Sequence, residues 1–164
     1  MVLAVVSILI AIAIYAFSKP LCKAKSSEIM AMFSELKQKE DTYIAEAGTY
    51  LCTDPTCDET VLWPTPLPGR GGAMAATPTP LRWQQLKINP VKSQLYCQYG
   101  VVAGLAGAAP TGVKGQMLYP TPATGHWYYL IAQCDWDSDP AATANAWYYQ
   151  RGDSYEMGYE NACR

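Results

Sequence analysis

The chain has 164 residues, of which 50% are hydrophobic and 16% are charged, and its formal net charge is −2. This length accommodates one modest domain and little else, which excludes a second catalytic domain. Because 12 lysines and arginines are outnumbered by 14 aspartates and glutamates, the chain lacks the basic excess that binds a polyphosphate backbone. Nucleic acid is therefore not an expected partner.

The first predicted element is an apolar helix. Among residues 1–17 only Ser7 has a polar side chain, and the first charged residue is Lys19. A helix that crosses a bilayer core needs about 20 apolar residues, so this run is slightly short, yet it is too continuous for an amphipathic surface helix. A cleaved signal peptide is the alternative, but no basic residue precedes the run and no good cleavage site follows it. We predict that residues 1–18 form a retained membrane segment.

An amphipathic continuation of this helix is predicted over residues 19–47, with a kink at Pro20 and an end at Gly48. Charged residues, among them Glu28 and Glu35, are assigned largely to the other faces of the helix. The apolar residues recur at helical spacing, which predicts one buried stripe formed by Ile29, Met32, Phe33, Leu36, Tyr43, Ile44 and Ala47.

Residues 48–164 are predicted to form a globular head. A proline-rich loop covers about residues 53–92, with Trp83 and Leu86 as its anchors on the core. Within about residues 93–160, strand-like runs cover residues 94–103, 126–134, 145–150 and, more weakly, 154–159. Apolar and polar residues alternate in the first run, which predicts a sheet with one buried face. The predicted fold class is α+β, a long N-terminal helix packed on an antiparallel β-meander of three to four strands.

Six cysteines beside a membrane segment indicate export to an oxidising compartment. Proximity favours a disulfide between Cys52 and Cys57. Cys97 and Cys134 are predicted on the inward faces of neighbouring strands, and Cys163 would tie the C-terminal tail to either of them, because spacing alone does not fix connectivity. The sixth cysteine, close to the membrane segment, is expected to be a free thiol.

These elements in this order resemble the type IV pilins and pseudopilins. VVSILIAIAIYAF is similar to the hydrophobic segment of that family, AKSSE to the start of its amphipathic half, and YIAEAGTY to the segment that ends its helix. RWQQLKINP, QYGVVAG, YYLIAQCDWDSD and YEN are similar to its sheet segments. The family also has a leader that ends in glycine, then a methylated phenylalanine and an assembly glutamate, and we expect that these are missing from the start of this sequence.

The resemblance implies a structural subunit, with a minor pilin among the options, of a type IV pilus or related filament for motility, adhesion or secretion. A pseudopilin of type II secretion is an alternative within the same resemblance. Such a subunit is a single-pass protein of the inner membrane before assembly, and then part of an extracellular filament with copies of itself and other pilin subunits. Assembly would run through the apolar residues Val2, Val5, Val6, Ile8, Leu9, Ile12, Ile14 and Phe17.

Two other classes of function, an anchored binding domain and an enzyme, compete with a filament subunit. A membrane-anchored extracytoplasmic domain would bind carbohydrate or protein by stacking on its aromatic-rich loops, although alternating aromatic residues are commonly cross-strand packing pairs. The aromatic residues concerned are Trp127, Tyr129, Trp136, Trp147 and Tyr149. An enzyme is not expected, because the single histidine, His126, cannot be assigned to a nucleophile and no GxSxG, HExxH or P-loop string occurs.

One segment suggests a metal ligand set. Asp135, Asp137 and Asp139 in CDWDSDP place three carboxylates at alternating positions, a spacing able to collect a hard cation such as calcium. Pro140 and Ala146 stand where a calcium-binding helix-loop-helix needs glycine and glutamate, so that motif is excluded. Acidic turns are usually solvated hairpin tips, and no other cofactor is expected.

Overall fold

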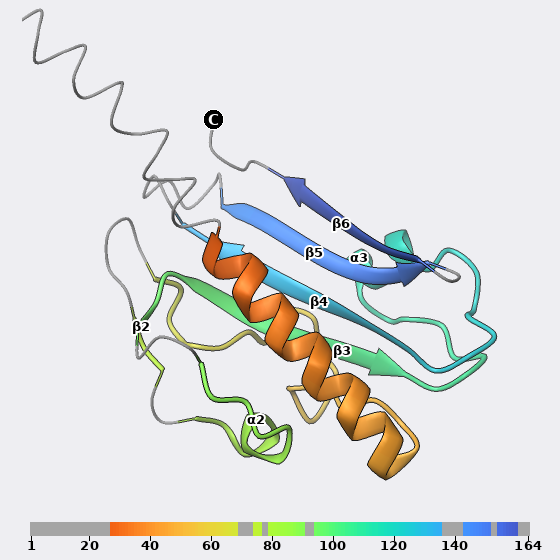
Figure 1. Ribbon diagram of the computed structural model, residues 1–164. Helices are drawn as coiled ribbons and strands as arrows, with labels where there is room; N and C mark the ends of the chain where they lie inside the picture. The colour runs from red at the N-terminus through yellow and green to blue at the C-terminus, as the bar shows by residue number, and fades with distance from the viewer. Residues whose placement is uncertain are drawn as a thin grey trace, which may run out of the picture.

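The computed structural model describes residues 27–68, 74–76, 79–90, 94–135, 143–151 and 154–160. A helix over residues 27–47, which we call the N-terminal helix, lies across a four-stranded antiparallel sheet (Figure 1). The other elements in chain order are β1 (Met74–Ala75), α2 (Leu81–Gln85), β2 (Gln94–Leu95), β3 (Cys97–Gly104), α3 (Val113–Leu118), β4 (Trp127–Cys134), β5 (Ala144–Arg151) and β6 (Ser154–Glu160). The predicted α+β class is confirmed, while the apolar segment 1–18 lies outside the described residues.

The sheet is a simple meander with the order β3-β4-β5-β6. Each strand pairs antiparallel with the next, and the register between β3 and β4 joins Cys97 to Cys134 and Gly104 to Trp127. The predicted run 94–103 is wrong in one respect, because it splits into β2, which pairs with β1, and β3. The split falls at Tyr96, whose backbone N–H donates to the Glu28 carboxylate at 2.9 Å instead of continuing the ladder.

The main core lies between the N-terminal helix and one face of the sheet. The helix contributes Ile29, Met32, Phe33 and Leu36, each at most 2% exposed, which confirms the buried stripe over these positions. Farther along the helix, Tyr43 and Ile44 are half-buried and Ala47 is exposed, so the stripe fades toward the end of the helix. Burial of each large apolar side chain stabilises the fold by about 1.5–3 kcal/mol.

The helix ends where the sequence predicts. Gly48 has φ +77° and its N–H donates to the Ile44 carbonyl at 2.8 Å, an arrangement that ends many helices with a left-handed glycine. The proline-rich loop is anchored as predicted, since Trp83 and Leu86 are both buried in the main core. Trp83 also packs against Trp63, with 4.8 Å between ring centroids.

The sheet is buried on both faces, so the prediction of a single buried face is wrong. Gln98 and Val102 of β3, which point away from the N-terminal helix, are also buried. A second core on that face contains Leu62, Val102, Leu118, Trp127, Tyr129, Ile131 and Tyr149. The connection between β3 and β4, which contains α3, supplies part of its cover (Figure 1). On the face of β3 that points away from the N-terminal helix, Gln98 is the last polar side chain, so the alternation that predicted a solvated face does not continue along the strand.

Candidate functional site

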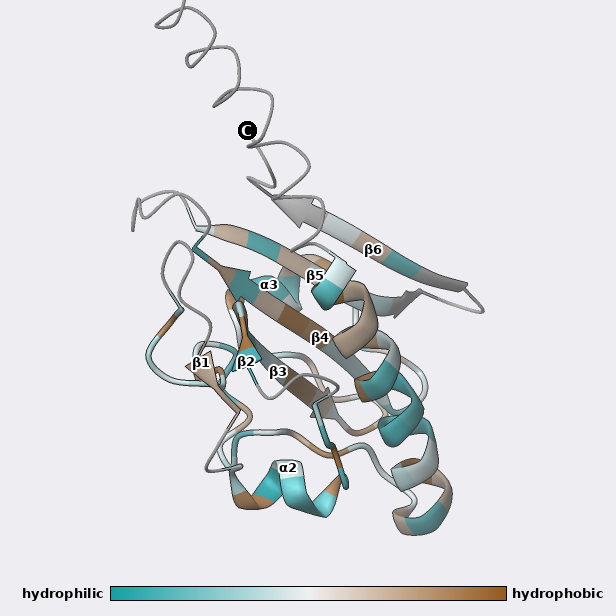
Figure 2. Cartoon of the chain, turned by 60° about the vertical axis from the view of Figure 1, so that its left-hand side comes forward, coloured by the Kyte–Doolittle hydropathy of each residue, from teal (hydrophilic) through white to brown (hydrophobic). Residues whose placement is uncertain are grey.

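The outward surface of the N-terminal helix is the candidate interaction surface of the head. Its exposed positions recur every three or four residues and carry mostly small or polar side chains: Ser27, Ala31, Ser34, Gln38, Asp41, Thr42 and Ala45. Met30, which is 50% exposed, is the large apolar residue on this outer face. Figure 2 shows the helix lying along one side of the sheet with polar and mixed residues on its visible surface.

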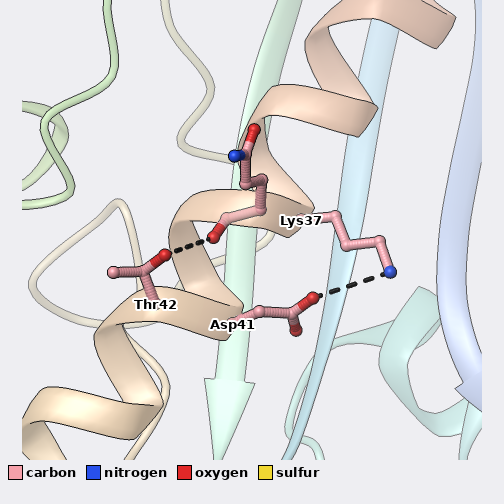
Figure 3. A network of polar contacts seen from close by, with 4 residues as sticks. Lys37, Asp41 and Thr42 are labelled. Carbon is pink, nitrogen blue, oxygen red and sulfur yellow. Dashed lines mark hydrogen bonds and ion pairs between the residues drawn. The ribbon is translucent and has the colours of Figure 1, made fainter.

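Local polar contacts organise this outer face (Figure 3). The Lys37 ammonium lies 3.6 Å from the Asp41 carboxylate one helical turn later, and the Thr42 hydroxyl donates to the Gln38 carbonyl at 2.9 Å. An exposed ion pair at this spacing stabilises a helix by only about 0.3–0.5 kcal/mol. The face can therefore exchange these contacts for contacts with a neighbouring molecule at little expense of stability.

Glutamates on the inward side of the same helix hold three other segments of the chain. Glu28 accepts the Tyr99 hydroxyl at 2.9 Å, Glu35 accepts the Asn89 N–H at 2.9 Å, and Glu40 accepts the Leu51 N–H at 3.0 Å. The assignment of Glu28 to another face is therefore wrong, since Glu28 is buried, and Glu35 is half-buried. Glu28, Met32, Leu36 and Glu40 follow one another in steps of four, which is the signal that places these acids within the apolar stripe.

Burial between the N-terminal helix and the sheet raises the pKa of two groups, Glu40 and Tyr99. It raises the pKa of Glu40 from its ordinary 4.5 to about 8; the Leu51 N–H opposes this shift in pKa, and the Asp41 charge adds to it. The second Glu40 oxygen, Oε1, is buried with no hydrogen-bond partner among the described residues. Burial, followed by the negative charge and hydrogen bond of Glu28, raises the pKa of Tyr99 well above its ordinary range.

A fourth carboxylate, that of Glu59, holds α3 against the far face of the sheet. Its two oxygens accept the N–H groups of Lys114 and Gly115 at 3.0 and 3.1 Å, in the first turn of α3. The Tyr129 hydroxyl donates to the same carboxylate at 2.9 Å, and burial and the bond to Glu59 raise the pKa of Tyr129 above its ordinary range. Unpaired N–H groups at the start of a helix favour such an acceptor.

The aromatic residues considered for ligand stacking are largely enclosed. Trp127, Tyr129 and Tyr149 are buried in the second core. Trp147 is half-buried, with the Lys114 ammonium 3.9 Å from its ring centroid and Gly158 against the ring. Trp136 lies outside the described residues. These four aromatic residues therefore fit the alternative interpretation, in which alternating aromatic side chains pack against neighbouring strands and do not stack on a ligand.

Two disulfides join predicted cysteines. The pair Cys52–Cys57, which we call the short-loop disulfide, confirms the pairing favoured by proximity. Cys97–Cys134, the long-loop disulfide, joins the directly paired ends of β3 and β4. Of the remaining cysteines, Cys163 lies outside the described residues.

Other predicted site residues are only partly placed. Asp135 directly follows β4, whereas Asp137, Asp139 and the assembly residues between Val2 and Phe17 lie outside the described residues. In the described part of the chain, no group of three or more histidine, cysteine, aspartate or glutamate side chains is arranged to hold a metal ion. The calcium site at Asp135, Asp137 and Asp139 stays a prediction.

Within the described ranges, no helix combines the length and the apolar character needed to cross a membrane. Comparisons with protein-family models, curated proteins and solved structures give no match to this chain.

Proposed function

We propose that the chain is a structural subunit of a type IV pilus or a related filament, assembled through its N-terminal apolar segment. One observation carries the proposal: an apolar run of 17 residues precedes a helix whose inner face packs on a four-stranded antiparallel meander. The apolar run avoids water in lipid before assembly and against the apolar runs of neighbouring subunits afterwards. Pilin-like architecture and membrane location are part of the same proposal.

The two halves of the helix suit two different surroundings. The inner face of residues 27–47 is covered by the sheet, so this half needs no partner to bury its stripe. Apart from Ser7 and the hydroxyl at the tip of Tyr15, the side chains of the apolar run carry no polar group, so nearly every direction around that helix suits contact with lipid or another apolar helix. Small residues such as Ala4, Ser7 and Ala11 allow close approach of neighbouring helices.

The anchored binding domain receives less support as a second candidate. It needs aromatic rings that are accessible to a ligand, whereas Tyr129 is fully buried and Trp127 and Tyr149 are less than a tenth exposed. A pseudopilin of a secretion system would use the same helix and sheet, and differs in the filament to which it contributes.

Disulfide crosslinking through the apolar run tests the proposal. In cells, the double variant Ser7→Cys with Leu9→Cys, which places the two thiols on nearly opposite sides of the helix, is oxidised and the products are separated by size without reducing agent. A filament subunit gives a ladder of covalent oligomers, because each helix contacts more than one neighbour. The unsubstituted chain controls for its own cysteines, and Leu81→Cys with Val113→Cys, at two highly exposed head positions, controls for random collision.

Deletion of the gene supplies an independent test. Loss of surface filaments in electron micrographs, or loss of twitching or secretion that the intact gene restores, supports the proposal. A monomeric product in the crosslinking assay together with an unchanged phenotype would refute it.

A further inference from the structure

A shallow groove runs between the second half of the N-terminal helix and the end of α2. Gln38, Lys39, Tyr43 and Glu46 line it from the helix, and Gln85 and Lys87 line it from the opposite side. Figures 1 and 2 both place α2 at the end of the domain toward which the helix runs. The groove is thus built from segments about forty residues apart in the sequence, and it is distinct from the aromatic second core.

Two lysines whose ammonium groups have no partner in the described segments line this groove. Of the four lysines that the structure describes, Lys37 pairs with Asp41 and Lys114 lies over the ring of Trp147. The ammonium groups of the other two, Lys39 and Lys87, have neither an ion pair nor a hydrogen bond within the described segments, and both residues line this groove. Lys39 is half-buried, so its carbon stem lies along the wall of the groove.

Lys87 occupies a backbone position that favours glycine. It has φ +54°, its N–H donates to the Gln84 carbonyl at 2.9 Å, and the next N–H, that of Ile88, donates to the Trp83 carbonyl at 3.2 Å. This pattern ends helices with a left-handed residue that is usually glycine, because a Cβ there is strained. A cation near a helix C-terminus gains from the helix dipole, but α2 has only five residues and provides little of it. A lysine at this strained position makes its side chain a candidate for a functional role.

We propose that the groove binds the carboxylate of an acidic pyranose sugar. The two ammonium groups supply charge-assisted hydrogen bonds to the carboxylate. The amides of Gln38 and Gln85 donate hydrogen bonds to ring hydroxyls or accept them, and the carboxylate of Glu46 accepts them. The half-buried Tyr43 offers an apolar surface beside these groups. Glu46 repels any anion, but the two lysines outnumber it, which suits the single carboxylate of a uronide. An acidic peptide brings adjacent carboxylates and leaves the amides without hydroxyl partners. Binding at the head needs no filament, so this inference is independent of the proposed assembly.

A matched pair of sugars tests the inference. Methyl β-glucuronide and methyl β-glucoside differ only in a carboxylate that replaces a hydroxymethyl group, and the galacturonide and galactoside form a second pair. Saturation-transfer NMR on the full chain in detergent measures each dissociation constant. We expect at least one uronide to bind about tenfold or more tightly than its neutral partner, because a hydrogen bond to a charged group contributes a factor of this size. Added salt weakens that difference.

Lysine variants locate the binding. Lys39→Gln and Lys87→Gln each weaken uronide binding about tenfold, whereas Lys37→Gln, on the same helix but paired with Asp41, leaves it unchanged. Lys87→Gly separates binding from folding, because it relieves the strained backbone: this variant loses uronide binding while its melting temperature rises.

Three results would overturn the inference. The first is equal binding, or no binding, of all acidic and neutral sugars. The second is a loss of binding in Lys37→Gln as large as in Lys39→Gln. The third is a triglutamate peptide that binds this groove more tightly than either uronide, which would assign it to an acidic protein partner.

Discussion

Glu40→Gln is expected to remove a pH dependence from the stability of the head. Glu40 is fully buried and its pKa is raised from 4.5 to about 8, so between these pH values the folded state holds a proton that the unfolded chain releases. The free energy of unfolding therefore falls as pH rises through this window, by up to about 1.4 kcal/mol per pH unit for one proton. The contribution of Glu40 to the free energy of unfolding is greatest below pH 4.5, and it is fully lost above about pH 8.

The magnitude follows from the width of that window. The full shift corresponds to at most about 5 kcal/mol between the two limits, and relaxation of the buried site reduces it. Glutamine keeps the acceptor for the Leu51 N–H and cannot ionise. The variant should therefore match the wild type near pH 5 and become the more stable protein at pH 8.

Urea unfolding of the full chain in detergent, followed by tryptophan fluorescence at pH 5, 6, 7 and 8, measures this difference. Glu46→Gln is the matched control, because Glu46 lies on the same helix but is exposed, so this variant should retain the slope of the wild type. A difference between Glu40→Gln and the wild type that does not change with pH would refute the reasoning, as would a difference of the opposite sign.

Three further outcomes concern the stability of the sheet, each measured by thermal unfolding. Gly104→Ala places a Cβ against the indole ring of its cross-strand partner Trp127, closer than van der Waals contact allows, and should cost about 1–3 kcal/mol, whereas Gly125→Ala, where nothing lies within 4 Å, should be close to neutral; equal effects would contradict the packing argument. Tyr129→Phe removes the hydroxyl that donates to the Glu59 carboxylate and should cost about 1.5–3 kcal/mol, with faster amide exchange in α3; unchanged exchange would show that this bond does not hold the helix. Replacing both cysteines of the long-loop disulfide by alanine should cost about 4 kcal/mol, against about 2 kcal/mol for the short-loop disulfide, because their sequence separations are 37 and 5 residues; the reverse order would show that native contacts outweigh loop entropy.

Features that depend on short-range spacing were readable from the sequence. The stripe of Ile29, Met32, Phe33 and Leu36 and the stop at Gly48 require only the helical period and the left-handed freedom of glycine. The strands β3 to β6 appear as separate runs for the same kind of reason, since strand residues alternate with a period of two. The pairing of Cys52 with Cys57 follows from their closeness in the chain.

Features that depend on distant partners were not readable. A glutamate within an apolar stripe conflicts with the hydrophobic pattern until its partners are known, and those of Glu28 and Glu40 are a tyrosine hydroxyl 71 residues away and an N–H 11 residues away. The second buried face of the sheet escaped prediction because its cover is an irregular connection with a short helix, α3, which has no strong periodic signal.

By itself, the sequence determined that an apolar run is followed by a one-sided helix and a small β-rich, disulfide-linked head, because side-chain spacing and composition encode these features locally. Only the tertiary structure decided which carboxylates are buried, that both faces of the sheet are covered, and that Lys39 and Lys87 share one groove. Those outcomes depend on which distant segments meet. The segments that meet are the ones that give the buried polar groups hydrogen-bond partners and at the same time pack the two cores.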